Sequence, residues 1–253
     1  MNEKHVTLSV GALAGAVERE GLGTLHLALQ PEPMWIPQEE QASARSALDN
    51  ELLEAGLLDR RGRLDPDFLD WLPVLTNAAI EYYGWLSQED GPTWSVLAAS
   101  RGLQGVLAVR EGDRVTLTVA DHTDLPATLV RQLPDVGPGG GSRWVVRVTD
   151  FKEALQHTHH DRAVAAVVAE ISKVMERPAY GGGELYVAER DPSGHRHTLR
   201  NPLHYVDTDW GRYLNHRVRT GDEEELRVQP ADAATLAATL ESLRSHLVRT
   251  QHA

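Results

Sequence analysis

The sequence predicts an internally duplicated α+β fold, and three observations support this prediction. Strand-like segments follow one another in two meanders, within residues 82–119 and 184–228. In each meander the first strand ends in an acidic turn that contains Gly and Pro, residues typical of turns. Each meander is followed by a helical segment. The repeated order of strand, helices, meander and helix therefore predicts two pseudo-repeats, at about 20–135 and 142–250, within a single domain spanning 1–253.

The second pseudo-repeat has the clearer pattern. Strands are predicted on both sides of the turn Asp191–Gly194, in Glu184–Arg190, Leu203–Thr208, Trp210–Val218 and Glu225–Val228. A helix from Ala233 to Leu247 follows, with Asp232 as its N-cap. One face of this helix carries an apolar stripe formed by Leu236, Leu240, Leu243 and Leu247.

The first pseudo-repeat matches the second more weakly. Tyr82–Pro92 corresponds in position to Glu184–Gly194. Upstream, residues 24–29 are predicted as a strand that precedes helices, as Trp144–Val148 precedes the helix at 163–176. Gly181–Gly183 is predicted as a turn that ends this last helix. The alternative is two unrelated α+β stretches that share turn residues.

Composition limits the function. The 253 residues are 41% hydrophobic, which is enough for a core, and the net charge of −12 argues against nucleic acid or an anionic membrane as the main partner. The absence of Cys excludes disulfides and thiolate metal sites. The apolar run Val10–Val17 is too short to span a bilayer, and the first residues lack the layout of a signal peptide. These features predict a cytoplasmic protein without membrane insertion.

One cluster suggests a metal, and it defines the alternative function. His157, His160 and Asp161 would share a helix face, as in a metal-dependent hydrolase. No second ligand motif accompanies them, so we expect no metal, no cofactor and no enzyme activity. Asp207 and Asp209 could form a carboxylate pair, but one of them is expected to pair with Arg212 instead.

Several segments together resemble the EspG family, the chaperones of actinobacterial type VII (ESX) secretion. The resemblance covers nearly the whole chain and is most specific at residues 205–213, Tyr-Val-Asp-Thr-Asp-Trp-Gly-Arg-Tyr. Weaker matches lie at 55–58, 65–66, 71–72, 82–85, 133–134, 183–191 and 228–232. The resemblance implies a central antiparallel β-sheet with helical bundles and quasi-twofold symmetry. It also implies a non-enzymatic protein that binds the hydrophobic tip of a PE–PPE type helical substrate and helps to target it for export.

The resemblance also implies where a partner would bind: at a loop early in the first meander, on the sheet face and on a C-terminal helical bundle. By position, the loop is Gln88, Glu89, Asp90, Gly91 and Pro92. The bundle would combine the helices at 163–176 and 233–248. Which of Leu236, Leu240, Leu243 and Leu247 face the partner rather than the core stays open, as does an adaptor role with a partner outside secretion.

Overall fold

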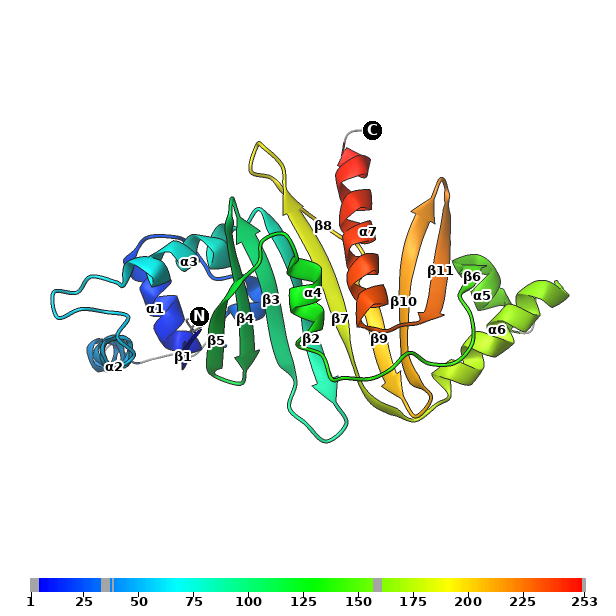
Figure 1. Cartoon of the computed structure of the whole chain (residues 1–253), viewed down its shortest axis with the longest axis horizontal. Coiled ribbons are helices and arrows are strands. Elements are labelled where there is room, and N and C mark those ends of the chain that lie inside the picture. The colour runs from blue at the N-terminus through cyan, green and yellow to red at the C-terminus, as the bar shows by residue number, and fades with distance from the viewer. Residues whose placement is uncertain (1–4, 33–36, 38, 157–160, 252–253) are drawn as a thin grey trace.

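A single eleven-stranded antiparallel sheet forms the centre of the computed structural model, which describes residues 5–32, 37, 39–156 and 161–251 (Figure 1). The strands are β1 His5–Ser9, β2 Ile80–Gln88, β3 Trp94–Arg101, β4 Gln104–Glu111, β5 Arg114–Ala120, β6 Trp144–Arg147, β7 Ala179–Arg190, β8 Arg196–Thr198, β9 Leu203–Thr208, β10 Gly211–Thr220 and β11 Glu223–Pro230. The helices are α1 Val10–Arg19, the 3₁₀ turn η1 Leu27–Leu29, α2 Gln41–Glu54, α3 Pro66–Asn77, α4 Leu125–Val130, α5 Val148–Leu155, α6 Arg162–Met175 and α7 Ala233–Gln251.

The order of the strands reads the same from both edges of the sheet. From one edge to the centre it runs β1-β5-β4-β3-β2, and from the other edge it runs β6-β11-β10-β9-β7. The two halves meet where β2 pairs antiparallel with β7, with Tyr83 opposite Tyr186. The predicted α+β class with a central antiparallel sheet and quasi-twofold duplication is confirmed by this architecture. The repeat boundaries stay a prediction.

Two details of the predicted duplication are wrong. Residues 24–29 contain the 3₁₀ turn η1 instead of a strand. The strand that occupies the position equivalent to β6 is β1, which lies at the opposite edge and also leads directly into a helix. Polar and apolar residues alternate at 24–29 because this segment packs on the core without joining the sheet. Leu25 and Leu29 are buried, and the His26 N–H donates to the Leu75 carbonyl at 2.8 Å.

The second error concerns register. Tyr82 packs in the core beneath α4 and α7, whereas Glu184 lies opposite Trp85 on the other face of the sheet. The twofold rotation that relates the two halves exchanges α4 with α7, which lie on the same face of the sheet. Such a rotation places every side chain on the face from which it started. Matching Tyr82 with Glu184 is therefore wrong by one position, and in a strand a shift of one residue exchanges the two faces.

Helices cover the two faces of the sheet unequally. On the face shown in Figure 1, α4 and α7 pack side by side over the central strands, and Leu129, Leu236 and Leu240 are fully buried there. On the opposite face α1 and α3 cover the first half of the sheet, and α5 and α6 cover only the outer strands of the second half. Asp232 accepts a hydrogen bond from the Thr235 N–H at 2.7 Å, as predicted for the N-cap of α7, and Asp65 caps α3 in the same way by accepting one from the Phe68 N–H.

The two C-terminal helices do not form one bundle. The apolar face of α6, with Val168 and Ile171, packs on Val146 of β6 and Val228 of β11. By contrast, α7 packs on α4 and β7 across the sheet. The prediction that combined 163–176 with 233–248 is wrong, because each helix buries its own apolar face against a different side of the sheet.

Candidate protein-binding groove

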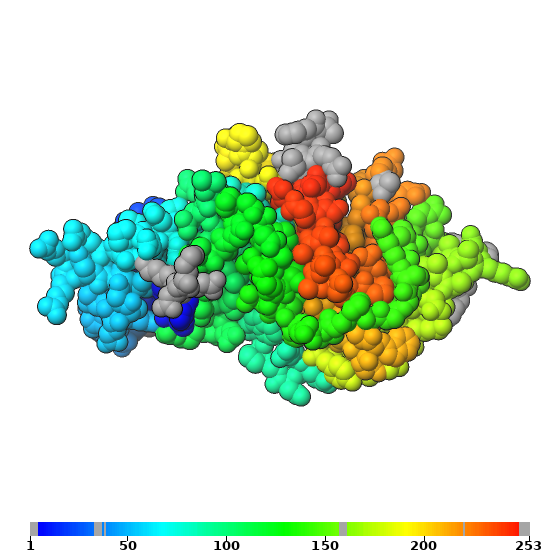
Figure 2. Space-filling view, in the orientation of Figure 1, coloured from blue at the N-terminus to red at the C-terminus, as the bar shows by residue number. Residues whose placement is uncertain are grey.

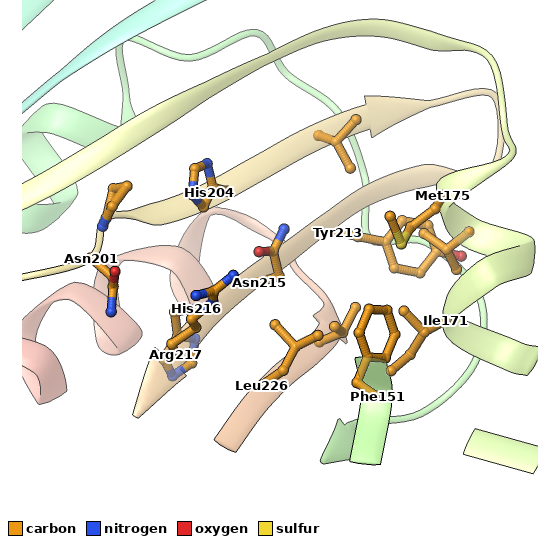
Figure 3. A pocket seen from close by; sticks show the side chains of 14 residues that line it. Phe151, Ile171, Met175, Asn201, His204, Tyr213, Asn215, His216, Arg217 and Leu226 are labelled. Atoms are coloured by element: carbon orange, nitrogen blue, oxygen red, sulfur yellow. The ribbon is translucent and has the colours of Figure 1, made fainter. Parts of the chain in front are cut away.

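A groove of about 390 Å³ opens where α6 leaves the sheet uncovered (Figure 3). The helices contribute Phe151 from α5 and Ile171, Val174 and Met175 from α6. The strands β9, β10 and β11 form the floor, with side chains that include His204, Val206, Tyr213, Asn215, Leu226 and Val228. Figure 3 shows that the labelled apolar side chains gather near the helices and that Asn201, His204, Asn215, His216 and Arg217 lie at the other end. The groove is thus apolar at one end and polar at the other.

The apolar end is only partly closed. Ile171 is 1% exposed and Val228 6%, so both belong to a small core, whereas Met175 is 69% exposed at the last position of α6. A methionine in this position offers a flexible and polarizable surface that adapts to different apolar partners. An exposed apolar patch beside a half-filled groove is typical of a surface that contacts another protein.

The same face continues toward β2 across a stretch of strand without side chains. Gly181, Gly182 and Gly183 lie in β7, so the prediction that they form a turn is wrong. A Cβ atom on Gly183 would approach the Trp85 carbonyl oxygen to 2.6 Å and one on Gly182 the Tyr205 carbonyl oxygen to 2.8 Å, so β7 needs glycine to lie between its neighbours here. Residues 181–184 form a shallow second hollow with Ser87–Glu89, and His204 lines both this hollow and the groove.

An aromatic cluster borders this hollow on the side of β2. Tyr186 stacks on Tyr83 with 5.3 Å between ring centroids and meets Trp85 edge to face at 5.7 Å. The Tyr186 hydroxyl donates to the Glu184 carboxylate at 2.8 Å. Burial first, and the Glu184 hydrogen bond second, raise the pKa of Tyr186 to about 12. Tyr186 therefore stays protonated at neutral pH and fixes Glu184 at the rim of the hollow.

The predicted loop Gln88–Pro92 lies at the end of this face and is exposed throughout. Its position is fixed by the Glu89 N–H, which donates to the Tyr180 carbonyl at 2.9 Å, and by the Gly91 N–H, which donates to the Gln88 carbonyl at 3.2 Å. Figure 1 places the loop at the same end of the central strands as the start of β7 and the β9–β10 turn. Glu89 and Asp90 are thus presented to solvent from an anchored turn, as recognition residues commonly are.

Tyr180 and Trp210 add exposed aromatic surface at this end of the strands, where their exposed fractions are 51% and 48%. The Arg177 guanidinium lies 4.4 Å from the centre of the Trp210 ring and forms a two-pronged ion pair with Asp209. A cation held over an indole ring fixes the orientation of the ring. Met175, Tyr180 and Trp210 were not among the contact residues expected from the sequence, where the only signal was their apolar character next to polar neighbours.

A buried ion pair supports the β9–β10 hairpin beneath this edge. Arg212 Nε and Nη2 donate to the Asp207 carboxylate at 2.6 and 2.8 Å, and both residues are less than 5% exposed. Nη2 also donates to the Pro134 carbonyl at 2.8 Å, which ties the connector between the two halves to the hairpin. The predicted pairing of Arg212 with one of the two aspartates is confirmed, and the partner is Asp207.

The predicted contact residues of α7 have a different environment. Leu236 and Leu240 are fully buried and Leu243 is 8% exposed, and all three pack in the core on the face away from the groove. Leu247 is half-buried. Burial makes the first three leucines structural residues, so the helical wall of the groove comes from α5 and α6 instead of α7.

The alternative metal site lies partly outside the described residues, since these exclude His157 and His160. Asp161 is the N-cap of α6, and its carboxylate accepts a hydrogen bond from the Ala163 N–H at 2.7 Å. Among the residues that the structure describes, no group of three or more His, Asp or Glu side chains is arranged to hold a metal ion. In the same residues no helix combines the length and the apolar character needed to cross a membrane.

The fold and the groove are those of an α+β protein with a surface suited to an apolar protein partner. The family model described as the EspG family matches residues 9–242, so the chain belongs to the EspG family. The chain is 24% identical over 247 residues to the ESX-3 secretion-associated protein EspG3 of Mycolicibacterium smegmatis, covering 90% of this chain and 82% of that protein. The family predicted from the sequence is confirmed.

A solved structure shares the architecture. The Mycobacterium tuberculosis type VII secretion system chaperone EspG5, determined in complex with the PE25–PPE41 dimer, superposes with a TM-score of 0.71 at 15% identity. The match covers 96% of this chain and 97% of EspG5. At this level of identity the likeness establishes the fold.

Proposed function

We propose that the protein is a cytoplasmic, non-enzymatic chaperone of type VII secretion that binds the apolar tip of a PE–PPE type helical substrate. The observation that carries the proposal is the open groove bounded by Phe151, Ile171 and Met175. The chain that carries this groove belongs to the EspG family. EspG5 was solved with a PE–PPE dimer, which supports the partner class.

The groove and its surroundings fit the physical requirements of this task. An exposed apolar helix tip would aggregate, and a groove that covers it removes this hazard. The apolar end would take the tip, and the polar end with His204 and Asn215 would form part of a rim that sets the orientation. Because a chaperone must release its substrate, we expect an interface of about 1,600 Å² in total or less.

The loop Gln88–Pro92 belongs to the same proposed interface. It carries two acidic side chains at one end of the face, while the groove supplies apolar contacts at the other. Rim charges mainly affect the rate of association and exclude wrong partners, whereas buried apolar contacts slow dissociation. We therefore assign selection of the partner to Glu89 and Asp90 and retention of the partner to the groove.

Binding of purified PE–PPE heterodimers, measured by biolayer interferometry, tests the proposal. Met175→Glu places a charge at the apolar end of the groove, and we expect dissociation to become at least about tenfold faster. Leu103→Glu is the matched control, because Leu103 is 84% exposed in the β3–β4 turn of the other half. The proposal is wrong if no PE–PPE dimer binds the wild-type protein, or if both variants lose binding equally.

A further inference from the structure

Another hollow, of about 730 Å³, lies on the α7 side of the sheet. It is bounded by the C-terminal half of α7, the segment that joins β8 to β9 and the β10–β11 hairpin. It adjoins the groove, because Asn201, His216 and Arg217 line both. We call it the α7 cleft. In Figure 1 the hairpin diverges from α7 toward the C-terminal end of the helix, and the cleft opens there. Figure 2 shows α7 at the surface, with the β10–β11 hairpin beside it.

The α7 cleft is basic in an acidic protein. Arginine side chains at positions 200, 217, 219 and 227 line it together with Asp222 and Glu224, whereas the whole chain carries a net charge of −12. Arg217 lies 3.8 Å from Glu224. Arg200 and Arg219 are exposed and form no ion pair with any residue that the structure describes. Two guanidinium groups at the cleft thus lack a carboxylate partner among the described residues, and that of Arg219 is oriented by a hydrogen bond from Nε to the Gly221 carbonyl at 3.3 Å.

His216 provides an independent sign of a missing partner. Its side chain lines the cleft and is only 8% exposed, yet its Nδ1 atom forms no hydrogen bond to any residue in the described ranges. Burial, and then the positive charges of Arg227 and Arg143, lower the pKa of His216 to about 4. A buried polar atom without a hydrogen bond destabilises a fold, and an incoming acceptor for the Nδ1 proton would remove that cost.

The apolar part of the lining restricts the kind of anion. Leu199, Val218, Leu243 and Leu247 lie among the basic residues of the cleft. Inorganic phosphate would leave this apolar surface exposed, and a polynucleotide would be repelled by the net negative charge of the chain. An occupant that combines carboxylates with apolar side chains satisfies both parts of the lining.

We propose that the α7 cleft binds a short acidic segment of a second protein, with its carboxylates at Arg200, Arg219 and His216 and its apolar side chains on Leu199, Val218 and Leu247. This site adjoins the groove proposed for the secretion substrate, with which it shares Asn201, His216 and Arg217, but it lies against α7 instead of α6. The protein would then hold its substrate on one side of β10 and an acidic partner segment on the other, as an adaptor between two proteins must.

A synthetic 12-residue peptide of alternating Glu and Leu is the probe, and a peptide with Lys in place of Glu is its control. We expect the acidic peptide to shift the ¹H–¹³C ring signals of His216 and to bind at least about tenfold more weakly when salt is raised from about 50 to 500 mM. The double variant Arg200→Glu/Arg219→Glu should weaken binding at least about tenfold, as charge reversal replaces attraction by repulsion.

Three controls keep this result separate from the proposed function. Arg60→Glu/Arg101→Glu changes the net charge equally at exposed positions far from the cleft and should leave peptide binding unchanged. Met175→Glu should also leave it unchanged, although it impairs binding of the PE–PPE dimer. Unshifted His216 signals, equal binding of the Lys peptide, or full competition by sodium phosphate would each overturn the proposal, the last by revealing a site for a small anion only.

Discussion

The two halves of the sheet share one strand order, but they are covered differently on the face that carries the groove. In the first half, α1 and α3 bury a continuous core that includes Leu13, Phe68 and Leu72, each 0% exposed. In the second half, α5 and α6 bury little beyond Val146, Val168, Ile171 and Val228. Duplication of the sheet thus sets the topology, while the helical layer decides which half keeps an open face.

The physical reason is the place where each helical layer meets the sheet. In the first half α3 packs on β3 and β4, which are inner strands. In the second half α5 and α6 pack on β6 and β11 at the outer edge, so β9 and β10 keep one face uncovered. Uncovered apolar surface reduces stability, since burial contributes about 25 cal/mol per Å². We therefore expect the first half to be the more stable one against local unfolding.

The largest expected effect concerns the hairpins β3–β4 and β9–β10, which occupy equivalent places in the two halves of the sheet. One step inside the β3–β4 turn the paired residues are Ser100 and Gly105, and at the same step in the β9–β10 turn they are Asp207 and Arg212. Arg212→Met leaves the Asp207 carboxylate buried without its cation, which should reduce the free energy of unfolding by about 3–5 kcal/mol. Urea denaturation at pH 7 measures this change.

The double variant Asp207→Leu/Arg212→Met removes both charges and should recover most of the loss. Arg45→Met provides the exposed control, because Arg45 and its partner Glu18 are 74% and 75% exposed and their pair should contribute less than about 1 kcal/mol. A loss below about 1 kcal/mol in Arg212→Met would show that water reaches this pair, and the contrast between the hairpins would disappear.

A second prediction compares the two helical layers directly. Leu72 on α3 is 0% exposed and Ile171 on α6 is 1% exposed, but Ile171 lines the open groove. Leu72→Ala should cost about 3–4 kcal/mol because it leaves a closed cavity, and Ile171→Ala about 2–3 kcal/mol because its space joins the groove. Chemical denaturation of both variants checks the order. Equal losses would mean that the groove is closed in solution.

Local features of this fold could be predicted from the sequence, and distant ones could not. The N-caps Asp65 and Asp232 lie next to the helices they begin, and Asp207 and Arg212 face each other across a short turn, so a few residues determine them. The strand expected at 24–29 has the right alternation, but no neighbouring strand pairs with it.

The candidate site depends on such distant pairings. Alternation along β9 does not reveal which face α6 leaves open, and the stripe on α7 looks the same whether it meets a partner or α4. For this reason the loop Gln88–Pro92 could be proposed from turn chemistry, whereas Met175, Tyr180 and Trp210 became visible only in three dimensions.

The third prediction uses a pair of matched positions. His216 is the sixth residue of β10, and the sixth residue of β4 is Val109. The pKa of His216 is about 4 in the fold, below the ordinary value of 6.5, so the neutral form is favoured. Protonation of His216 therefore does not reduce the stability of the fold above pH 6.5. As the pH falls from 6.5 toward 4, the unfolded chain binds this proton first, and the free energy of unfolding decreases by up to about 3 kcal/mol.

Thermal melting between pH 7.5 and 4 tests the role of His216 with the variant His216→Val, which introduces the residue of the first half. The wild-type protein should lose more stability than His216→Val over this range, since both share all other titrating groups. If the melting temperatures of the two proteins depend on pH in the same way, the pKa of His216 is the same in the folded and in the unfolded chain.

The smallest change in stability, and the sharpest test of recognition, is expected at the loop Gln88–Pro92. Glu89→Lys/Asp90→Lys alters two exposed side chains, so the free energy of unfolding should change by less than about 0.5 kcal/mol. The association rate with a PE–PPE dimer should change severalfold at low salt and converge on the wild-type rate at high salt, because screening removes the contribution of rim charges. Asp222→Lys/Glu223→Lys, at the last turn residue before β11 and the first residue of β11, makes the same change of charge on the second half of the sheet. If both double variants change the rate equally, the net charge of the protein steers the partner. If only the loop variant does, the partner docks across β2 and β7, where the two halves of the sheet meet.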